Sequence, residues 1–590
     1  MCGIVGYIGN QDALRIVMQG LEKLEYRGYD SAGVAIYENG EIAVTRARGK
    51  LRELKKLFKD RPSSQIANIG IGHTRWATHG KPSEENAHPH RAGRISLIHN
   101  GIIENYIELR EELIEQGCDF TSETDTEIIA QLFNQVVGEE QCTFESMKKV
   151  CKRIRGSYAF LALDSKHPDR IFVAKNATPI VVGLSEGEIF IASDIPAILS
   201  HTRDVLILED GDIAEISLEG IKIEADGVEV TRETERITWD PITAQKGGFK
   251  HYMLKEVHDQ VEVSAETFRS RVELKITKEE INNINRIVLV ACGTAWHACL
   301  LAKFFIEDVA KIPCEVDYAS EYRYRTTLVD ENTLVMAVSQ SGETADTLAA
   351  IQHVSSRAKT MAICNVLGSS LSRVVNDTIY THAGPEISVA STKAFTTQLI
   401  AVYIFALYLA QERGENIEAV YEEPIKALTQ LPDYEEIAKQ FHGASDFLFI
   451  GRGLLYPIAL EGALKLKEIS YIHAEGYPAG ELKHGPLALI DEEMPVVVLL
   501  QKDEIPYEKT LSNLREVESR GGRIIVITDS DKTDKLKDVA EKIIKVPFVS
   551  NAMSPIIMNI PLQLLSYCIA VRNGTDVDLP RNLAKSVTVE

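Results

Sequence analysis

Short apolar runs, separated by glycine, asparagine and aspartate, dominate residues 2–238 of the chain. Runs with such boundaries are typical of β-strands. They fall at residues 2–8, 32–37, 68–77, 94–103, 158–164, 170–175, 180–184 and 189–194. Residues 12–25 and 124–137 instead repeat apolar side chains at helical spacing, and Thr124 and Asp125 are suited to cap the second helix. This pattern predicts stacked sheets with flanking helices.

From about residue 272 the apolar pattern changes, and the new pattern occurs twice. In each copy a buried-type strand runs into a glycine turn and a helix, and the turns at Gly293 and Gly453 lie about 160 positions apart. Two further strands follow in each copy, at 333–338 and 360–365 and at 495–500 and 523–529. Strands that alternate with helices predict a parallel sheet in each copy. Ligands of such sheets bind beyond the carboxyl ends of the strands.

Between the two parts, residues 239–271 lose the strand rhythm and contain Pro241 and the pair Gly247-Gly248, which indicates a linker. The last residues, from Thr575, have no periodic apolar face and read as a tail. The longest apolar run, Leu399 to Ala410, is too short to span a bilayer and predicts a buried helix.

Length, net charge and cysteine usage indicate a multidomain protein of the cytosol that does not bind nucleic acid. The chain has 590 residues, which at about 150 residues per domain predicts three to four domains. A formal net charge of −22 argues against binding to nucleic acid or to an anionic membrane. Nine cysteines without CxxC pairs, and no signal-peptide pattern, favour the reducing cytosol. The segment His88-Pro89-His90 is the one histidine cluster that suggests a metal, and we interpret it as a loop, so no metal is expected.

The first candidate for chemistry is Cys2. If the initiator methionine is removed, Cys2 carries a thiol and a free α-amine, which is a nucleophile with a base on the same residue. The alternative is a buried cysteine at the start of a strand. A thiolate that attacks an amide needs an oxyanion hole, and the side chain of Asn100 with the backbone N–H of Gly101 is suited to that role.

An amino-acid substrate needs an arginine for its carboxylate and an acid for its ammonium group, and Arg75 and Asp125 offer that pair. Each of these residues also has a structural interpretation. Asn100-Gly101 fits a hairpin turn, Arg75 a surface ion pair and Asp125 a helix cap. The alternatives stay open for each residue taken singly, and the combination with Cys2 favours the catalytic interpretation.

In the second part, Ser339 to Thr344 place hydroxyls and a glycine where a strand meets a helix, which suits an anion such as a phosphate. A capping box would satisfy the same residues. A dinucleotide fold is a rival that we reject, because neither glycine turn reads GxGxxG. Residues 388–393 add further hydroxyls.

Glu461, Lys465 and Glu468 fall on one stripe of a predicted helix. The stripe is either part of a site or a surface with salt bridges. His484 lies between glycines, where it can move protons near neutral pH.

The first segment, with Cys2, Arg75, Asn100-Gly101 and Asp125, resembles the class II glutamine amidotransferases over its whole length. This resemblance implies a four-layer αββα N-terminal-nucleophile domain over residues 2–238. Cys2 is then the nucleophile and its amine the base, and Asn100 and Gly101 form the oxyanion hole. Arg75, Thr78, His79 and Asp125 are the implied glutamine contacts. The implied half-reaction releases glutamate and ammonia through a thioester at Cys2.

The motifs SQSGETADT, ASTKAFTTQ, EGALKLKEISYIHAE, GELKHGP and DLPRNLAKSVTVE resemble the sugar isomerase (SIS) domains and tail of the glutamine:fructose-6-phosphate aminotransferase family. The match covers essentially the entire chain. It implies a linker over 239–271, SIS domains of αβα type over 272–420 and 436–572, and a tail over 573–590 that closes the sugar site. It also implies glutamine and fructose 6-phosphate as substrates, glucosamine 6-phosphate as product, no cofactor, and a cytoplasmic homodimer.

The resemblance also assigns roles within the sugar site. The residues that hold the sugar phosphate or line its site are Ser339, Gln340, Ser341, Thr344, Thr294, Val389 and Ser391. His484, which can come from the neighbouring subunit, opens the sugar ring. Lys585 forms a Schiff base with the ketose, and Glu468 moves a proton from C1 to C2 with Lys465 and Glu461 in support. Ammonia would be protonated in bulk water, so we expect a sealed passage between the sites with Trp76 as its gate.

One position departs from the family pattern, which usually reads Cys-Gly-Thr-Ser where this chain has Cys292-Gly293-Thr294-Ala295. The missing hydroxyl puts affinity for the sugar in question rather than the type of reaction. Two other functions stay open: a SIS isomerase or deaminase that uses free ammonia, and a regulatory protein that binds a sugar phosphate. The first would have lost Cys2 or Arg75, and the second would need neither Glu468 nor Lys585.

Overall fold

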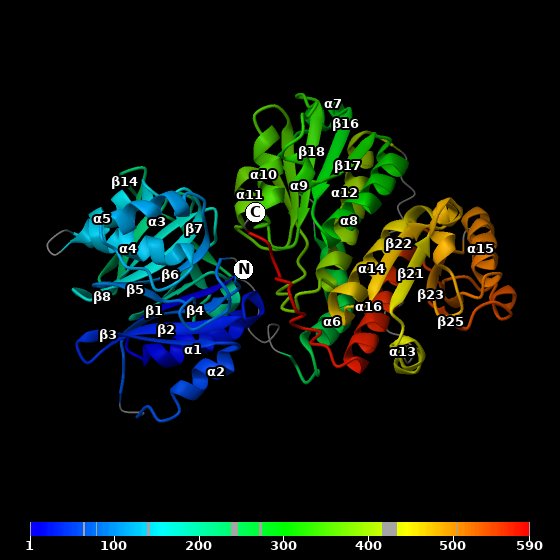
Figure 1. Ribbon diagram of the computed structural model, residues 1–590. Coiled ribbons are helices and arrows are strands. Elements are labelled where there is room, and N and C mark those ends of the chain that lie inside the picture. The colour runs from blue at the N-terminus through cyan, green and yellow to red at the C-terminus, as the bar shows by residue number, and fades with distance from the viewer. Residues whose placement is uncertain are drawn as a thin grey trace. The chain divides into compact units, whose positions relative to one another are not determined.

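The structure is a computed structural model that describes residues 2–62, 65–77, 79–138, 142–237, 246–270, 274–415, 434–502 and 504–588. These residues form two compact units (Figure 1). The first comprises Met1–Ala244 together with Ala584–Glu590, and the second comprises Gln245–Leu583. The expected boundaries at residues 239 and 271–272, and all of residues 416–433, lie outside the described residues.

The first unit is built on two antiparallel sheets. The eight-stranded sheet has the order β15-β11-β9-β10-β1-β4-β2-β3, and the seven-stranded sheet has the order β14-β13-β12-β8-β7-β6-β5. The strands of the first sheet are β1 (Gly3–Ile8), β2 (Ser31–Glu38), β3 (Glu41–Arg48), β4 (Ile69–Arg75), β9 (Val181–Ser185), β10 (Glu188–Ala192), β11 (Asp204–Ile207) and β15 (Thr234–Arg236). Those of the second are β5 (His90–Ala92), β6 (Ile95–Ile103), β7 (Gly156–Asp164), β8 (His167–Asn176), β12 (Ile213–Ser217), β13 (Gly220–Ala225) and β14 (Val228–Val230).

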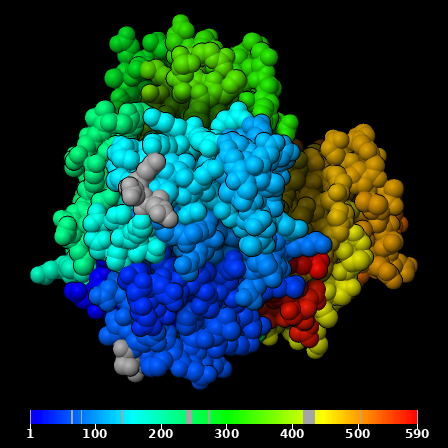
Figure 2. Space-filling model, turned by 60° about the vertical axis from the view of Figure 1, so that its left-hand side comes forward, coloured from blue at the N-terminus to red at the C-terminus, as the bar shows by residue number. Residues whose placement is uncertain are grey.

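Helices cover the outer face of each sheet, so the unit has four layers. α1 (Ala13–Leu24) packs on β1 and β4, while α4 (Asp125–Val137) packs on β5 and β6. Branched aliphatic side chains such as Ile4, Ile71 and Leu161 fill the space between the sheets. Figure 2 shows the blue N-terminal segments of this unit packed directly against the cyan segments that follow them. The αββα prediction is therefore confirmed.

Every strand and helix that the sequence analysis expects in the first unit is present. The pattern did not reveal the shorter or more polar elements: β3, β5, β11 to β15, and the helices α2 (Leu51–Leu57), α3 (Tyr106–Glu115) and α5 (Thr143–Cys151). β3 has two buried positions, is half-buried or exposed at the others and carries two arginines, so it lacks the apolar run that marks the other strands. Edge strands of this kind bury little side-chain area and leave a weak apolar signal.

The second unit contains two parallel five-stranded sheets with the same strand order, β17-β16-β18-β19-β20 and β22-β21-β23-β24-β25. In each sheet the second strand along the chain is an edge strand that pairs with the first, and the third strand pairs with the first on its other side. The identical order confirms the predicted repeat. The strands are β16 (Arg286–Ala291), β17 (Cys314–Tyr318), β18 (Thr333–Ser339), β19 (Lys359–Cys364), β20 (Asp377–Tyr380), β21 (Asp446–Gly451), β22 (His473–Pro478), β23 (Pro495–Leu500), β24 (Arg523–Thr528) and β25 (Lys542–Lys545).

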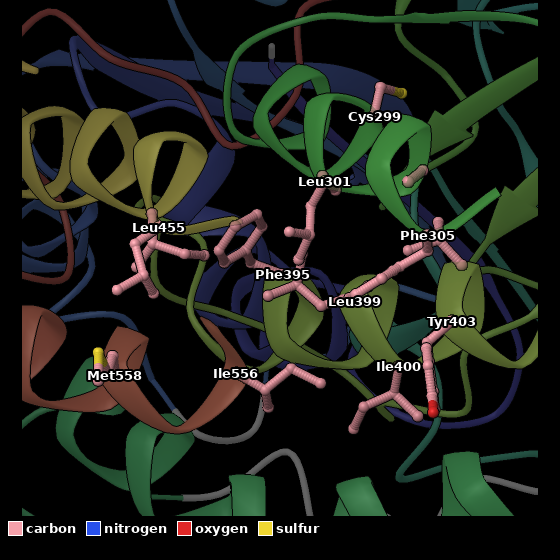
Figure 3. Packing of buried hydrophobic residues seen from close by; sticks show 14 of the residues in the cluster. Cys299, Leu301, Phe305, Phe395, Leu399, Ile400, Tyr403, Leu455, Ile556 and Met558 are labelled. Carbon is pink, nitrogen blue, oxygen red and sulfur yellow. The ribbon is translucent and has the colours of Figure 1, made fainter. Parts of the chain in front are cut away.

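Helices from both copies share one apolar core. Figure 3 shows Phe395 between Leu301 and Leu455, with Ile556 nearby. These side chains come from α12 (Lys393–Glu412), α8 (Thr294–Phe305), the 3-10 turn η5 (Gly453–Leu455) before α14 (Tyr456–Ser470), and α16 (Ser554–Arg572). The remaining helices of the unit are α6 (Tyr252–Arg269), α7 (Lys278–Asn283), α9 (Ala319–Tyr322), α10 (Ala345–Val354), α11 (Ser370–Val374), α13 (Glu435–Phe441) and α15 (Glu504–Glu518). The shared core makes the two copies one folding body.

Two helices, α12 and α16, are long and apolar enough to cross a membrane by length and composition. The apolar run at Leu399 to Ala410 predicts a helix shorter than α12. Polar residues extend α12 in both directions, to a length of 20 residues. Within their most apolar windows, 83% of α12 and 89% of α16 is buried inside the unit. The interpretation of this run as a buried helix is confirmed.

Candidate functional site

Cys2 lies immediately before β1, in the middle of the first sheet. Its Sγ accepts a hydrogen bond of 3.1 Å from the backbone N–H of Trp76, the residue that follows β4. Gly3 allows this close approach, because a Cβ there would lie 2.6 Å from Thr74 Oγ1. Burial raises the pKa of the Cys2 thiol, although the Trp76 N–H and the Arg75 guanidinium oppose the shift. The thiol is therefore protonated at rest and needs a base at the moment of attack.

Asn100 and Gly101 lie side by side on β6 and close to Cys2. The Asn100 amide donates through Nδ2 to the Cys2 carbonyl at 2.9 Å, and its Oδ1 accepts from His73 Nε2 at 3.0 Å. Because Oδ1 can only accept, His73 must carry its proton on Nε2 in this arrangement. Gly101 has φ +130°, and a Cβ there would lie 2.0 Å from the Ser157 carbonyl, so only glycine fits. Asn100 and Gly101 line the same cavity as Cys2.

Behind this site the structure gathers four buried histidines, His73, His88, His90 and His99. The His73 and His88 rings are 4.1 Å apart between centroids, and those of His88 and His90 are 5.0 Å apart. Burial lowers the pKa of all four, and lowers that of His73 to about 3, so the rings are neutral at physiological pH.

The interpretation of residues 88–90 as a loop is wrong at His90, which begins β5. Among the described residues no group of three His, Cys, Asp or Glu side chains could hold a metal ion. Spacing alone did not reveal the cluster, because His73, His90 and His99 lie on three different strands and His88 lies in the segment before β5.

Arg75 ends β4 and is buried rather than on the surface, so the surface ion-pair interpretation is wrong. Its Nη2 donates to the carbonyls of His79 and Gly80, the latter at 3.2 Å. Its Nη1 is buried and has no hydrogen-bond partner among the residues that the structure describes. A buried charged donor without a partner is unfavourable, so this atom is suited to a carboxylate that enters the pocket. Thr78 lies outside the described residues.

Asp125 is the first residue of α4, and the capping role belongs to Thr124, whose side chain accepts the N–H of Glu127. One Asp125 oxygen accepts the N–H of Ile103 at 2.9 Å, which fixes the carboxylate beside β6. The carboxylate is buried and faces the same cavity as Arg75 and Cys2.

A cavity of about 650 Å³, its open mouth included, joins these groups. Its walls include Cys2, Arg75, Trp76, His88, His99, Asn100, Gly101, Thr124, Asp125 and Thr126, together with Ala584, Ser586, Val587 and Thr588 from the end of the chain. Trp76 stands at this wall with its ring edge-on to Tyr29, 5.6 Å between centroids. The first unit therefore combines a thiol, an asparagine amide, a buried arginine and a carboxylate in one pocket, with the terminal residues as part of its wall.

In the second unit, the loop after β18 carries the predicted anion site. The Ser339 hydroxyl accepts the N–H of Gly342 at 3.0 Å, and the Ser341 hydroxyl accepts that of Glu343 at 3.1 Å. Gly342 has φ +65°, and a Cβ there would lie 2.2 Å from Ser369 Oγ. Thr344 precedes α10 without a side-chain capping bond, which argues against the capping-box alternative. With strand order 2-1-3-4-5, a ligand is expected between the carboxyl ends of β16 and β18, next to this loop.

The three charged residues on α14 form a buried network rather than a salt-bridged surface. Lys465 Nζ lies 3.3 Å from Glu461 and 2.6 Å from Glu468, and the Glu461 and Lys465 side chains are essentially inaccessible. Burial by itself lowers the pKa of Lys465, but the carboxylates of Glu461 and Glu468 outweigh it and raise the pKa. Lys465 is therefore a fixed cation that holds both carboxylates.

The network joins the two copies, because α8 of the first copy contributes Thr294 and His297. The Thr294 hydroxyl lies 3.1 Å from both Glu461 and Lys465, and His297 Nδ1 lies 2.7 Å from Glu461. The sequence analysis missed His297. Its position one helical turn after Thr294 was a signal, because residues at this spacing share a helix face.

The other predicted residues belong to other segments of the chain. Val389 is buried and donates its N–H to the Asp578 carbonyl at 3.0 Å, and Ser391 is half-buried two residues later. His484 is exposed at the end of the turn Ala479–His484, without a hydrogen bond or ion pair to another described residue. Lys585 belongs to the terminal residues grouped with the first unit. Gln340 is half-buried next to Ser341.

Comparison with known proteins decides the family. A glutamine amidotransferase domain matches residues 73–200, and SIS domains match 280–408 and 440–571. Glutamine–fructose-6-phosphate aminotransferases (isomerizing) of Clostridium tetani and Aquifex aeolicus are 48% and 47% identical to this chain, over all of this chain and all of theirs. The chain belongs to this aminotransferase family. The solved C-terminal domain of the glucosamine–fructose-6-phosphate aminotransferase from Francisella tularensis is 45% identical, with a TM-score of 0.54, and covers 57% of this chain and 100% of its own.

Membership of the family confirms the resemblance seen in the motifs. It also agrees with the observed fold, in which an αββα unit is followed by a unit with two parallel sheets. The amidotransferase match lies in the αββα unit with Cys2, and the SIS matches lie on the two parallel sheets. The matches begin and end inside the expected domains and do not test their boundaries.

Proposed function

We propose that this chain transfers the amide nitrogen of glutamine to fructose 6-phosphate with isomerisation, giving glucosamine 6-phosphate and glutamate, the first step of amino-sugar synthesis. The observation that carries the proposal is the presence of two different buried sites in one chain. One is a thiol pocket with an unpaired arginine donor, and the other is a carboxylate–lysine–carboxylate network beside a hydroxyl-rich loop. The names of the full-length relatives fit this combination.

In the glutaminase half-reaction, the α-amine of Cys2, freed by removal of the initiator methionine, takes the thiol proton. The thiolate attacks the glutamine amide, and Asn100 and Gly101 stabilise the oxyanion. Arg75 Nη1 binds the α-carboxylate and Asp125 binds the ammonium group, with Thr78 and His79 as further contacts. The C–N bond of the tetrahedral intermediate then breaks, and ammonia leaves with the proton that the Cys2 α-amine returns. Water hydrolyses the resulting thioester to glutamate and the free thiol. The raised pKa of the thiol supports a mechanism in which the base acts during attack.

In the synthase half-reaction, the 339–344 loop holds the phosphate through the Ser339 and Ser341 hydroxyls, Gln340 and Thr344. Thr294, Val389 and Ser391 line the sugar. His484 opens the ring, in one possible arrangement from the partner subunit of a homodimer, and Lys585 forms the Schiff base that ammonia displaces. Glu468 moves the proton from C1 to C2, held by Lys465 and Glu461. No metal or organic cofactor takes part in these steps.

Ammonia must reach the sugar before it is protonated, so we propose a closed passage with Trp76 as its gate. Trp76 lies at the wall of the Cys2 cavity, which supports this role. The variant Trp76→Ala should keep glutaminase turnover while the yield of amino sugar per glutamate falls. Equal yields in variant and parent would refute the gate.

The test of the function is one coupled assay in which purified protein receives glutamine and fructose 6-phosphate, and glutamate and glucosamine 6-phosphate are measured together. The parent should make both in nearly equal amounts. Cys2→Ala should abolish synthesis from glutamine but not from concentrated ammonium salt. Glutamate without amino sugar would mean that the SIS half takes another sugar phosphate, with Ala295 as the first position to examine.

Two alternatives predict other results in the same assay. A SIS isomerase or deaminase that uses free ammonia would make no glucosamine 6-phosphate from glutamine, with or without Cys2. A regulatory protein would bind sugar phosphate without turnover. The cytoplasm is the proposed location, in line with the cysteine usage.

A further inference from the structure

The loop between β20 and α12, residues 381–392, is held by a buried carboxylate that comes from another element. Glu256 lies on α6, the first long helix of the second unit, and is 2% exposed. Its Oε1 accepts the backbone N–H of Ile387 and, at 3.1 Å, that of Ser388. Its Oε2 accepts the Ser388 hydroxyl. One side chain thus ties three donors of two successive loop residues to α6.

Two consecutive N–H groups directed at the same oxygen fix the direction of the chain at that point. The residue after Ser388 is Val389, whose N–H is held by the Asp578 carbonyl at 3.0 Å. The Asp578 carboxylate in turn accepts the N–H of Tyr252 and of Met253, both at 2.9 Å, at the start of α6. The start of α6 therefore holds the loop at two neighbouring places, directly through Glu256 and indirectly through Asp578.

A buried carboxylate is unfavourable unless hydrogen bonds satisfy it, and three loop donors contact the two oxygens of Glu256. The far side of the loop is fixed separately, since Glu386 accepts the N–H of Thr392 and Ala394 at 2.8 and 3.0 Å. Val389 and Ser391, the residues expected to line the sugar, lie between these two anchors. Their position depends on both.

We propose that Glu256 is a positioning residue for the sugar phosphate, which sets the place of Val389 and Ser391 without touching the substrate. This inference rests on the proposed function. Loss of the carboxylate should let the 387–391 segment shift, so the affinity for the sugar phosphate falls. The glutaminase pocket is built from other residues and should not respond.

Three variants separate positioning from general stability. Glu256→Ala removes all three acceptor contacts. Glu256→Gln keeps Oε1 for the two N–H groups, and the Ser388 hydroxyl can then donate only to the Ala390 carbonyl, which it already meets at 3.1 Å. Asp377→Asn is the matched control, because Asp377 is another buried carboxylate of this unit that accepts two consecutive N–H groups, of Lys275 and Ile276, both at 2.8 Å.

The experiment measures kcat and KM for fructose 6-phosphate with glutamine as donor, and glutaminase turnover without sugar, in the full chain. Glu256→Ala should raise KM for the sugar about tenfold or more, because charge-assisted hydrogen bonds of this kind account for at least that factor. We expect a smaller rise in Glu256→Gln, parental KM in Asp377→Asn, and parental glutaminase turnover in all three variants.

The outcomes separate this inference from the function on which it rests. A parent that makes no glucosamine 6-phosphate from fructose 6-phosphate would overturn the proposed function itself. An active parent with unchanged KM in both Glu256 variants would overturn only the role of Glu256. Equal rises in KM in Glu256→Ala and Asp377→Asn would also overturn the role of Glu256, because the rise in KM would then reflect general destabilisation of the second unit. Glu256→Gln keeps the test valid if Glu256→Ala fails to fold.

Discussion

Acid should destabilise the first unit well above the pH at which carboxylates titrate, because its buried histidines must be neutral. Burial lowers the pKa of His73 to about 3, whereas a histidine in an unfolded chain titrates near 6.5. Below pH 6.5 the unfolded chain therefore binds a proton that the folded unit does not bind. Stability is then lost as the pH falls.

The size of the effect follows from these two pKa values. Between pH 7.0 and 5.5, the difference in proton binding at His73 alone lowers the free energy of unfolding by about 1.3 kcal/mol. His88, His90 and His99 act in the same direction, because burial lowers the pKa of each. Asp164, whose hydrogen bonds to Arg94 and Thr143 outweigh burial and lower its pKa, loses its contribution only at a more acidic pH, so it does not interfere in this window.

The assay is urea unfolding followed by the fluorescence of Trp76, in a background with Trp239 and Trp296 replaced by phenylalanine, since the chain has three tryptophans. The comparison is between this background and the same chain with His73→Gln, at pH 7.0 and 5.5. The variant is expected to be less stable at pH 7.0, but its loss on acidification should be smaller by about 1.3 kcal/mol. Equal losses in the two proteins would refute the assignment of a neutral, buried His73.

Three further changes test other parts of the structure. Asn100→Ala removes the donor that we propose for the oxyanion and should lower glutaminase kcat about 10² to 10³-fold, with synthesis from ammonium unchanged in the coupled assay. Gly101→Ala should lower the melting temperature and abolish glutaminase activity, because the new Cβ would lie 2.0 Å from a carbonyl oxygen at φ +130°; a variant as stable and active as the parent would contradict the geometry. Lys465→Met leaves the fully buried Glu461 carboxylate and the half-buried Glu468 carboxylate without their cation and should destabilise the second unit by about 3 to 5 kcal/mol, measurable by chemical unfolding.

The sequence predicted the elements whose apolar pattern is strong and missed those whose pattern is weak. The central strands, such as β1, β18 and β23, are buried on both faces, so each is a continuous apolar run. β3 and β15 carry charges on exposed positions and gave no such signal. The same limit hid the polar extensions of α12.

Candidate residues next to one another in sequence were easier to predict than contacts between distant segments. Asn100 and Gly101 form one motif, and Glu461 and Lys465 share a helical stripe, so spacing alone identified them. The contact of His297 with Glu461 joins residues 164 positions apart. No periodicity encodes such a contact, because the shared core of the two copies creates it.

Burial and hydrogen bonding also separate the roles of the two carboxylates on α14, which spacing could not do. Glu461 has a fully buried side chain, and both of its oxygens are engaged by Lys465, Thr294 and His297. A carboxylate bound by three donors has its charge stabilised and its position fixed, so it is suited to support rather than to proton transfer. Glu468 keeps 20% of its side chain exposed and pairs with Lys465 at 2.6 Å. A carboxylate that is oriented by a cation yet reachable from outside can take a proton from one carbon and return it to the next, which is the role proposed for Glu468.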